Sequence, residues 1–400
     1  MWIESVIALK FLRQSLVQTA LILVGIAVGV AVIVFVTTLI TGLQSNIIAR
    51  TLGTQSHVRV EPPDEINRVP APPAGTLALV LEDKRAQRIR SINNWIQVRD
   101  TLDTLAEVTA VSPVIVGPAF ARRGEVRKSI SLIGIDPPRY EKIIAVSKDI
   151  IAGQFRVGAG DAVIGKLLAD DLGMRVGNKL RLESGDGSSA VVTIAGIFEL
   201  GVRDLDLRYV YVDMKQAQSL LNLVGGVTLI DVTVRDLFSA DVAAGRIRRL
   251  TGLKAESWMQ TNAQLMNALR SQSLSTAMIS FFVALSVAFG IASVLAISVT
   301  QRTREIGILR AMGIRQQQML RVFLVQGGLL GLAGSAAGGV GGSLLIWVFN
   351  TFGPKLFYIP LHALLIPLVM AAATVTGVLA AMVPAWRAAR MNPVEAIRYV

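Results

Sequence analysis

The sequence predicts a multi-pass α-helical membrane protein with four spans and one inserted α+β domain. Three observations predict it: long uncharged stretches, basic residues gathered in a few short segments, and mixed strand and helix patterns after the first stretch. Hydrophobic residues make up 52% of the 400 residues. The uncharged stretches are residues 14–49, 271–301, 322–354 and 356–386. Each exceeds the roughly 20 apolar residues that cross a bilayer, and buried helices of soluble proteins rarely run so long without a charge.

The distribution of basic residues predicts the topology of these spans. Eleven basic and three acidic residues lie outside residues 43–272, so most of the net charge of +12 belongs to the membrane part. Ten of the eleven fall in the N-terminal segment, in residues 300–321 and in the C-terminal tail. By the positive-inside rule, both termini and the 300–321 loop are cytoplasmic, and the segment after the first span lies outside. The basic excess therefore indicates topology and not a nucleic-acid surface.

The expected segments follow from these runs in chain order. They are an amphipathic helix on the cytoplasmic face over residues 1–15, a first transmembrane helix over 16–42, an outer α+β domain over 43–270, a second transmembrane helix over 271–300, a cytoplasmic coupling loop or helix over 301–318, a third transmembrane helix over 319–349, a short outer loop over 350–362, a fourth transmembrane helix over 363–385 and a cytoplasmic tail over 386–400. Since the first apolar stretch is too long for the h-region of a signal peptide, we expect it to remain as an uncleaved anchor.

Strand and helix patterns alternate along the outer domain. Strands are expected near residues 56–60, 110–136 and 229–236, and helices near 93–108 and 239–252. Strand-into-helix units are expected at 161–174 and 207–223, a hairpin turning at 185–187, and a helix from 256 that continues without a break into the second span. Five prolines in residues 62–73 exclude a helix, and whether this segment is a linker or a partner-binding loop stays open.

Glycines at four-residue spacing predict where helices approach closely. Small residues at this interval let two backbones come together within a membrane. The first span holds such a pair, and the third span holds a longer row. The residues are Gly25 and Gly29, then Gly327, Gly331, Gly334, Gly338 and Gly342. No span carries a charged residue, which disfavours an ion-coupled transporter.

Catalytic and metal-binding motifs are not evident in the sequence. Gly160 and Gly165–Lys166 have the spacing of a phosphate loop, but Leu167 stands where Ser or Thr would hold magnesium. A turn from strand to helix is the simpler interpretation. With two histidines and no cysteine, a zinc site of the usual kind is not expected. We therefore expect no catalytic residue, no metal site and no cofactor bound by this chain.

The segment TQRTREIGILRAMGIRQQQMLR, residues 300–321, interrupts the apolar chain with five arginines and one glutamate. Its pattern predicts a short helix at the inner membrane surface, with one apolar side and projecting charges, that ends at Gly313. The arginines could simply satisfy the positive-inside rule, or the helix could dock a cytoplasmic partner that moves the spans. The residue pattern leaves both interpretations open.

Several segments resemble one known superfamily. REIGILRAMGIRQQQMLRVFLVQGGLLGLAGSAAGG resembles the segment after the second span in ABC-transporter permeases of the macrolide-exporter superfamily, and PAWRAARMNPVEAIRYV resembles their C-terminal ending. DAVIGKLLADDLGMRVGNKLRL, AGIFELG and YVYVDMKQAQSLL resemble their periplasmic domain. ESWMQTNAQLMNALRSQS and MLRVFLVQGGLLG are most similar to the lipoprotein-releasing permeases. The resemblance covers nearly the whole chain.

The resemblance implies a permease subunit of the bacterial inner membrane, with residues 43–270 in the periplasm. ATP and magnesium would be bound by a separate ATPase subunit, and the helix in the 301–318 segment would lie in a groove of that ATPase. The residues it assigns to this contact are Arg302, Arg304, Glu305, Ile306, Ile308, Leu309, Arg310 and Met312. Two permease chains, identical or different, would pair across the first and second spans. ATP binding would then tilt the spans and shift the periplasmic domains.

Two functions are compatible with this machinery. In the first, mechanotransmission extrudes an amphiphilic cargo, a lipoprotein or lipid, from the outer leaflet, with a periplasmic chaperone or adaptor as a further partner. It predicts an apolar pocket between the paired spans and the base of the periplasmic domains. In the second, the chain is a signalling subunit that moves no cargo and controls a periplasmic hydrolase. It predicts a polar membrane interior. The long exporter-like outer domain favours the first function.

Overall fold

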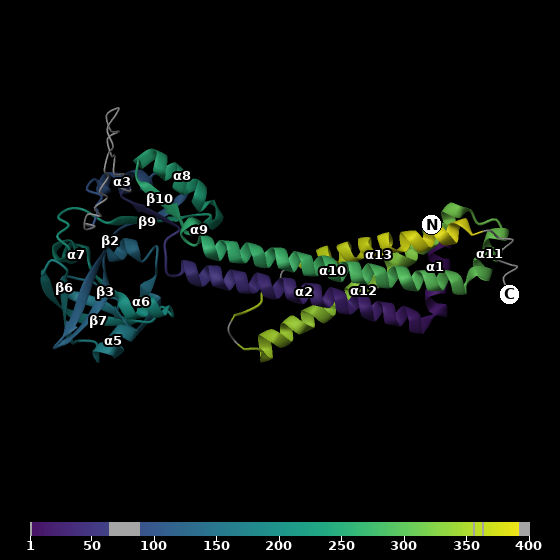
Figure 1. Ribbon diagram of the computed structural model, residues 1–400, viewed down its shortest axis with the longest axis horizontal. Helices are drawn as coiled ribbons and strands as arrows, with labels where there is room; N and C mark the ends of the chain where they lie inside the picture. Colours follow the sequence, from purple (N-terminus) through teal and green to yellow (C-terminus); the bar gives the residue numbers. More distant parts are fainter. Residues whose placement is uncertain (1, 64–88, 355–356, 362–363, 392–400) are drawn as a thin grey trace, which may run out of the picture. The chain divides into compact units, whose positions relative to one another are not determined.

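The computed structural model describes residues 2–63, 89–354, 357–361 and 364–391 (Figure 1). The chain divides into two compact units. The helical unit comprises residues 1–48 and 267–400, and the sheet unit comprises residues 49–266. Most of the proline-rich segment at 62–73 lies outside the described residues.

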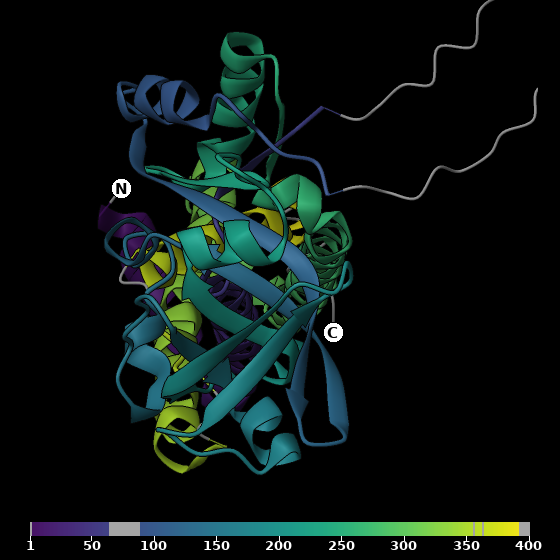
Figure 2. The same ribbon diagram turned by 90° about the vertical axis from the view of Figure 1, so that its left-hand side faces the viewer.

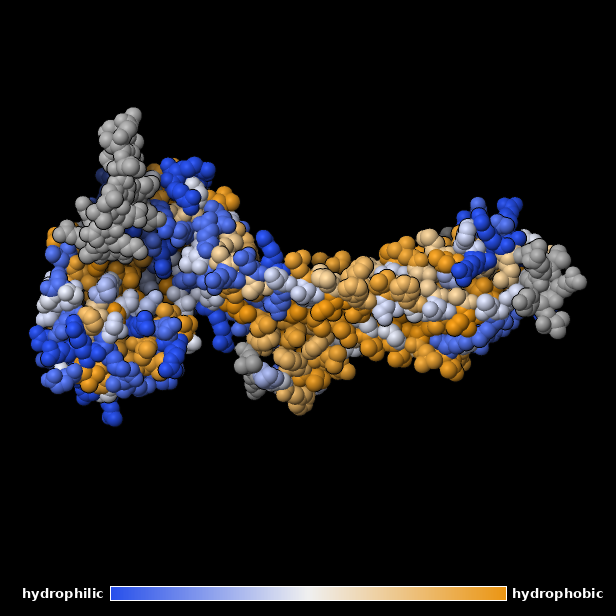
Figure 3. Space-filling model, in the orientation of Figure 1, coloured by the Kyte–Doolittle hydropathy of each residue, from blue (hydrophilic) through white to orange (hydrophobic). Residues whose placement is uncertain are grey.

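Four helices in the described part of the chain are long and apolar enough to cross a membrane. They are α2 (Leu16–Leu52), α10 (Ala263–Gln301), α12 (Gln316–Phe352) and α13 (Leu365–Arg390). The predicted fold class, four spans with an inserted α+β domain, is confirmed. The helices α2 and α10 extend past residues 42 and 271, and the positions at which they enter and leave the bilayer stay a prediction. Hydrophobic side chains cover the exposed faces of these helices, whereas the sheet unit has a largely polar surface (Figure 3).

Two short helices complete the helical unit. Helix α1 (Trp2–Gln14) precedes α2, and α11 (Thr303–Ala311) connects α10 to α12. Along α1, Glu4, Ala8 and Phe11 are buried at intervals of four and three residues, so they share one helix face. Val6 and Leu9 are exposed on another side. The apolar residues of α1 therefore divide between the protein core and its surface.

The glycines of α12 face two different helices. A Cβ atom at Gly327 would lie 2.5 Å from the carbonyl oxygen of Gly377 in α13, and one at Gly331 would lie 3.0 Å from that of Ala373. Farther along, a Cβ at Gly338 would lie 2.6 Å from the carbonyl oxygen of Ala27 in α2, and Gly334 and Gly342 also approach α2. The glycine row thus lets α12 pack closely on α13 and then on α2.

The two glycines of the first span differ from each other. A Cβ atom at Gly29 would lie 2.7 Å from Val287 Cγ2 in α10, so this glycine sits at a helix contact. At Gly25 a Cβ would meet nothing within 4 Å, because the residue borders a cavity between α2 and α10. The prediction that Gly25 mediates close packing is therefore wrong within a single chain.

The sheet unit contains a ten-stranded sheet in the described residues (Figure 2). Its strands are β1 (Val58–Glu61), β2 (Val108–Arg123), β3 (Val126–Ile135), β4 (Ile150–Gly153), β5 (Asp161–Gly165), β6 (Lys179–Ser184), β7 (Ser189–Phe198), β8 (Tyr209–Asp213), β9 (Leu229–Val234) and β10 (Lys254–Ser257). The order is β10-β1-β9-β2-β3-β8-β5-β7-β4, and β6 pairs with both β2 and β7. The pairings from β2 through β3, β8, β5, β7 and β6 return to β2, so six strands close a ring. The ring is possible because the long strand β2 pairs with different strands along its length.

Short helices accompany the strands of the sheet unit. They are α3 (Trp95–Asp103), α4 (Pro137–Tyr140), α5 (Lys166–Leu172), α6 (Arg203–Arg208), α7 (Met214–Leu220), α8 (Ala240–Thr251) and α9 (Trp258–Thr261), with 3₁₀ turns at Val146–Asp149 and Leu237–Ser239. One core cluster centres on Tyr211, whose ring lies 5.8 Å from that of Tyr140 and 5.4 Å from that of Phe198. This packing gives the sheet unit a core of its own.

Two local predictions for the sheet unit have opposite outcomes. The strand-to-helix turn at Gly165 is confirmed, since β5 runs directly into α5 and Lys166 forms an ion pair with Glu199 at 2.8 Å. The uninterrupted helix from 256 is wrong. Residue 256 belongs to β10, the hydroxyl of Ser257 accepts a hydrogen bond from Gln260 N at the start of α9, and Asn262 (φ −106°, ψ 38°) separates α9 from α10.

Candidate coupling surface and apolar groove

Helix α11 presents four of the predicted contact residues to its surroundings. Arg304 and Glu305 are exposed, as are Ile308 (44% exposed) and Met312 (78%). The helix ends in a Schellman motif, in which Ile314 N donates to the carbonyl of Leu309 and Gly313 takes φ +99°. We call Arg304, Glu305, Ile308 and Met312 the coupling face. It combines apolar side chains with one charge of each sign.

The opposite side of α11 is part of a buried cluster. Ile306 is fully buried and packs in the cluster that holds Phe11 of α1, Phe323 of α12 and Ala385 of α13. Leu309 is half-buried against the same cluster, and a guanidinium N–H of Arg310 donates to the carbonyl of Ala389 near the end of α13. The assignment of Ile306 to a partner contact is therefore corrected, because its side chain attaches α11 to the rest of the helical unit.

Arg302 also departs from its predicted role. Only 8% of the residue is exposed, and its guanidinium group donates hydrogen bonds to Phe11 O, Gln14 Oε1 and Ser15 Oγ. A buried cation is tolerated only when such acceptors replace its hydration. Arg302 is thus committed to α1 and is not available to a partner.

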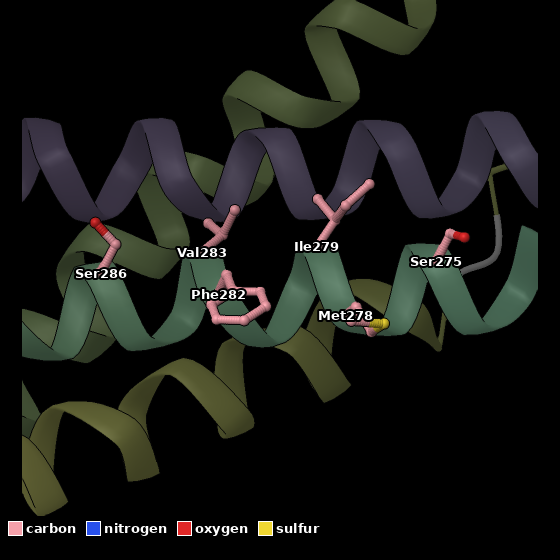
Figure 4. A pocket seen from close by; sticks show the side chains of 6 residues that line it. All are labelled: Ser275, Met278, Ile279, Phe282, Val283 and Ser286. Carbon is pink, nitrogen blue, oxygen red and sulfur yellow. The ribbon is translucent and has the colours of Figure 1, made fainter.

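A shallow, open apolar groove of about 570 Å³ runs along α10 and is lined by side chains of this helix alone (Figure 4). Its lining residues are Ser275, Met278, Ile279, Phe282, Val283 and Ser286. Figure 4 shows Ile279 and Val283 pointing toward α2, while Phe282 projects from another side of α10. These residues begin four positions into the predicted span at 271–300 and reach just past its middle. The sequence analysis did not identify them, because serines spaced along an apolar span are also common in ordinary helix packing.

A second cavity, of about 250 Å³, lies between α2 and α10. Gly25 and Gly290 help to line it, and neither has a heavy atom within 4 Å of a built Cβ position. Hydrogen bonds join the two helices beyond each end of this cavity. Gln18 Nε2 donates to Gln301 Oε1 at 3.3 Å, and Gln44 Nε2 donates to Ser273 Oγ at 3.1 Å. Hydrogen bonds therefore link the two helices toward their ends, and between these bonds the cavity lies next to the close contact of Gly29 with Val287.

Within the described part of the chain, no group of three or more His, Cys, Asp or Glu side chains could hold a metal ion.

Family models match both units of the chain. Residues 19–250 match the MacB-like periplasmic core domain, and residues 277–393 match the FtsX-like permease C-terminal region. The first match alone covers more than half of the chain. The chain therefore belongs to the ABC-transporter permease family with a MacB-like periplasmic core.

Individual relatives agree with this class. The chain is similar to the lipoprotein-releasing system transmembrane protein LolC of Xylella fastidiosa (strain 9a5c), with 26% identity over 77% of this chain and 82% of the relative. It is also similar to the macrolide export ATP-binding/permease protein MacB of Shewanella oneidensis, with 28% identity over 79% of this chain and 50% of the relative. The crystal structure of the periplasmic region of MacB from Actinobacillus actinomycetemcomitans is a loose likeness, 12% identical, with a TM-score of 0.36 over 55% of this chain and 96% of that one.

Membership of this family indicates on which side of the membrane the coupling face and the apolar groove lie. The chain is a multi-pass inner-membrane protein whose sheet unit is periplasmic. The sheet unit is inserted between α2 and α10, so these helices have their periplasmic ends beside it. Helix α11 joins the opposite ends of α10 and α12 and is therefore cytoplasmic. The coupling face thus meets the cytoplasm, and the apolar groove lies along the middle of α10, between Ser275 and Ser286.

Proposed function

We propose that this chain is the permease subunit of an ATP-driven machine that extrudes an amphiphilic cargo, a lipoprotein or lipid, from the outer leaflet of the inner membrane. A separate ATPase subunit binds ATP and magnesium and docks on the coupling face. The chain converts movement of that subunit into movement of its spans. The apolar groove on α10 is the observation that carries the cargo assignment.

The position and chemistry of the groove support an amphiphilic cargo. The groove runs from Ser275 to Ser286. At 1.5 Å per residue it extends from about 6 Å to about 22 Å below the predicted start of the span at 271, so it covers most of the depth of the outer-leaflet acyl chains and passes the midplane of the bilayer. Its apolar side chains suit an acyl chain. A signalling subunit without cargo has no need of such a groove.

The coupling face supports docking of an ATPase. Ile308 and Met312 are large apolar residues exposed on a cytoplasmic helix, outside the predicted spans. Exposed apolar residues rimmed by charges are typical of protein interfaces. The charges of Arg304 and Glu305 would then fix the orientation of the partner.

A second permease chain would complete the transport pathway by pairing across α2 and α10. Both helices expose large apolar side chains, among them Leu21, Val24 and Val28 of α2 and Phe281 and Phe289 of α10. Lipid could cover these residues as well as a partner chain. A pair of chains, identical or different, would enclose the groove and leave a passage that opens toward the periplasm.

The cargo assignment is tested by ATP-dependent release from proteoliposomes that contain the complete complex. We expect Phe282→Ser to reduce release of a triacylated lipoprotein at least about tenfold, since burial of a Phe side chain contributes about 1.5–3 kcal/mol. Leu379→Ser is the control, because Leu379 of α13 is a large apolar residue that is 58% exposed, lies on neither α2 nor α10 and does not line the groove. ATP hydrolysis without release of lipoprotein or lipid by the wild type would instead support the signalling function.

A further inference from the structure

Two helix corners of the helical unit meet at Arg302. Helix α1 ends at Gln14 and α2 begins at Leu16, which forms the first corner. Helix α10 ends at Gln301 and α11 begins at Thr303, which forms the second. Arg302 is the single residue between α10 and α11, and its side chain reaches across to the first corner.

The contacts of Arg302 cover the whole first corner. Its Nη1 donates to Gln14 Oε1 at 2.8 Å, and its Nη2 donates to Phe11 O at 2.9 Å and to Ser15 Oγ at 3.3 Å. The guanidinium carbon lies 4.7 Å from the centre of the Phe11 ring, which adds a cation–π contact. We call Arg302 with Phe11, Gln14 and Ser15 the Arg302 brace.

Elementary electrostatics explains why an arginine occupies this position. The last carbonyl groups of a helix have no partner within the helix and carry the negative end of its dipole. Phe11 O lies in the last turn of α1, where it also accepts a hydrogen bond from Ser15 Oγ at 3.3 Å, and Arg302 brings a cation to this negative end of the helix. Among the described residues no carboxylate forms an ion pair with Arg302, so its attachment depends on these neutral acceptors. Only a planar guanidinium with several fixed donors can reach all three acceptors, and a lysine cannot.

We infer that Arg302 is a positioning residue that makes the two corners move as one body. A displacement of α11 then carries α1 and the start of α2 along with the end of α10. The hydrogen bond between Gln18 and Gln301 lies beside the brace and links the same two helices. Without the brace, α11 would pull α10 through the continuous chain while α2 followed only through weaker contacts.

The brace has a different role from the coupling face that neighbours it. Arg304 is exposed two residues away and is placed to contact an ATPase, whereas Arg302 is turned inward toward α1. Removing Arg304 should weaken binding of the ATPase. Removing Arg302 should leave binding intact and interrupt transmission to α2. The brace transmits ATPase movement only if α11 docks an ATPase, as proposed above.

Spin labels can measure the brace in the full chain, because the sequence contains no cysteine. Labels at Val17→Cys in α2 and Ala311→Cys in α11 occupy exposed positions on either side of it. We expect one narrow distance distribution in the wild-type background and a broad one with Arg302→Gln. The population with separated corners should rise at least about tenfold, the size expected when a hydrogen bond to a charged group is lost. Arg304→Gln should leave the distribution narrow.

A second variant tests the brace from its other side. Gln14→Leu with Ser15→Ala removes two acceptors and keeps Arg302 in place, so it distinguishes a lost brace from a misfolded chain. We expect it to broaden the distribution as Arg302→Gln does, and Arg302→Lys to have an intermediate effect. A narrow distribution in both the Arg302→Gln and the Gln14→Leu/Ser15→Ala variants would overturn the inference.

A second distance measurement tests transmission in the complex of the chain with its ATPase. It uses spin labels at Val17→Cys in α2 and Ile297→Cys in α10, both exposed positions. We expect Arg302→Gln to retain the ATPase in co-purification but to lose the ATP-dependent change in the α2–α10 distance, and Arg304→Gln to lose the ATPase. Equal loss of the ATPase in both variants would overturn a transmission role for Arg302. If no ATPase co-purifies with the wild type, the proposed function fails, while the distance measurement in the chain alone still decides the brace.

Discussion

Asp231 is a buried carboxylate of the sheet unit whose ionisation we expect to make the stability of this unit depend on pH. Asp231 in β9 is buried beside Ser56, whose hydroxyl donates to it at 2.5 Å, and its Oδ1 lies 3.7 Å from Arg59 Nε. Burial raises the pKa of Asp231 above its usual value, against the opposing effects of Arg59 and Ser56. The folded form then binds a proton more tightly than the unfolded form. The stability that this proton adds is present below the unfolded pKa and is lost as pH rises through the folded pKa.

We therefore expect Asp231→Asn to remove part of the fall in stability between about pH 4 and neutral pH. The asparagine keeps an acceptor for Ser56 and carries no charge to bury. Thermal unfolding of the full chain across this range measures the effect, with the exposed Asp100→Asn as the control. An unchanged pH dependence in Asp231→Asn would show that burial of this carboxyl does not matter for stability.

Gly338 and Gly341 of α12 are a matched pair for testing how closely this helix packs on α2. A Cβ atom at Gly338 would lie 2.6 Å from Ala27 O, whereas one at Gly341 would meet only Ala31 Cβ at an ordinary 3.6 Å. We expect Gly338→Ala to destabilise the helical unit by about 1–3 kcal/mol through overpacking. Gly341→Ala should be neutral or slightly stabilising, because alanine favours helix. Unfolding in detergent compares the two, and equal stabilities would contradict the close contact of α12 with α2.

At the scale of elements, the two sides of α11 should respond differently to truncation. Ile306 is fully buried in the cluster with Phe11 and Phe323, so Ile306→Ala should destabilise the helical unit by about 2 kcal/mol or more. Ile308 is exposed, so Ile308→Ala should change stability by less than about 0.5 kcal/mol but weaken ATPase binding. Thermal unfolding and co-purification separate the two effects. The assignment of faces would be wrong if Ile308→Ala were the more destabilising variant.

The elements themselves could be predicted from the sequence more readily than their contacts. Uncharged length identified the four spans, and period-two alternation with glycine turns identified most strands. The strand β10 and the break at Asn262 were missed, because Ser257 caps α9 through a local hydrogen bond within a segment that reads as helix. The short strand β4 has no clear alternation, and it is held by its pairing with β7.

The candidate site was only partly predictable, since sequence alone does not show which helix ends meet. The arginines near 302–310 were interpreted as topology charges or partner contacts. The structure shows a third use: Arg302 caps α1, and Arg310 donates to the carbonyl of Ala389 near the C-terminus of α13. Likewise, four-residue spacing identified the small faces of α12 but not its two partners, and it did not distinguish Gly29 from Gly25.

At the scale of the whole molecule, the arrangement suits a converter of movement. The cytoplasmic side carries the coupling face, and the middle of α10 carries the apolar groove. The described residues of this chain show no site for ATP. In the function proposed above, a separate cytoplasmic ATPase drives this movement by binding α11.

Co-purification of the full chain from bacterial inner membranes tests that claim most directly. The wild type is compared with Arg304→Ala/Glu305→Ala on the coupling face and with Arg315→Ala, an exposed residue outside α11. We predict that mass spectrometry finds an ATP-binding-cassette ATPase with the wild type and with Arg315→Ala, and a strongly reduced amount with the double variant. The account would be contradicted by equal recovery with all three chains, or by no ATPase with the wild type under conditions that keep complexes intact.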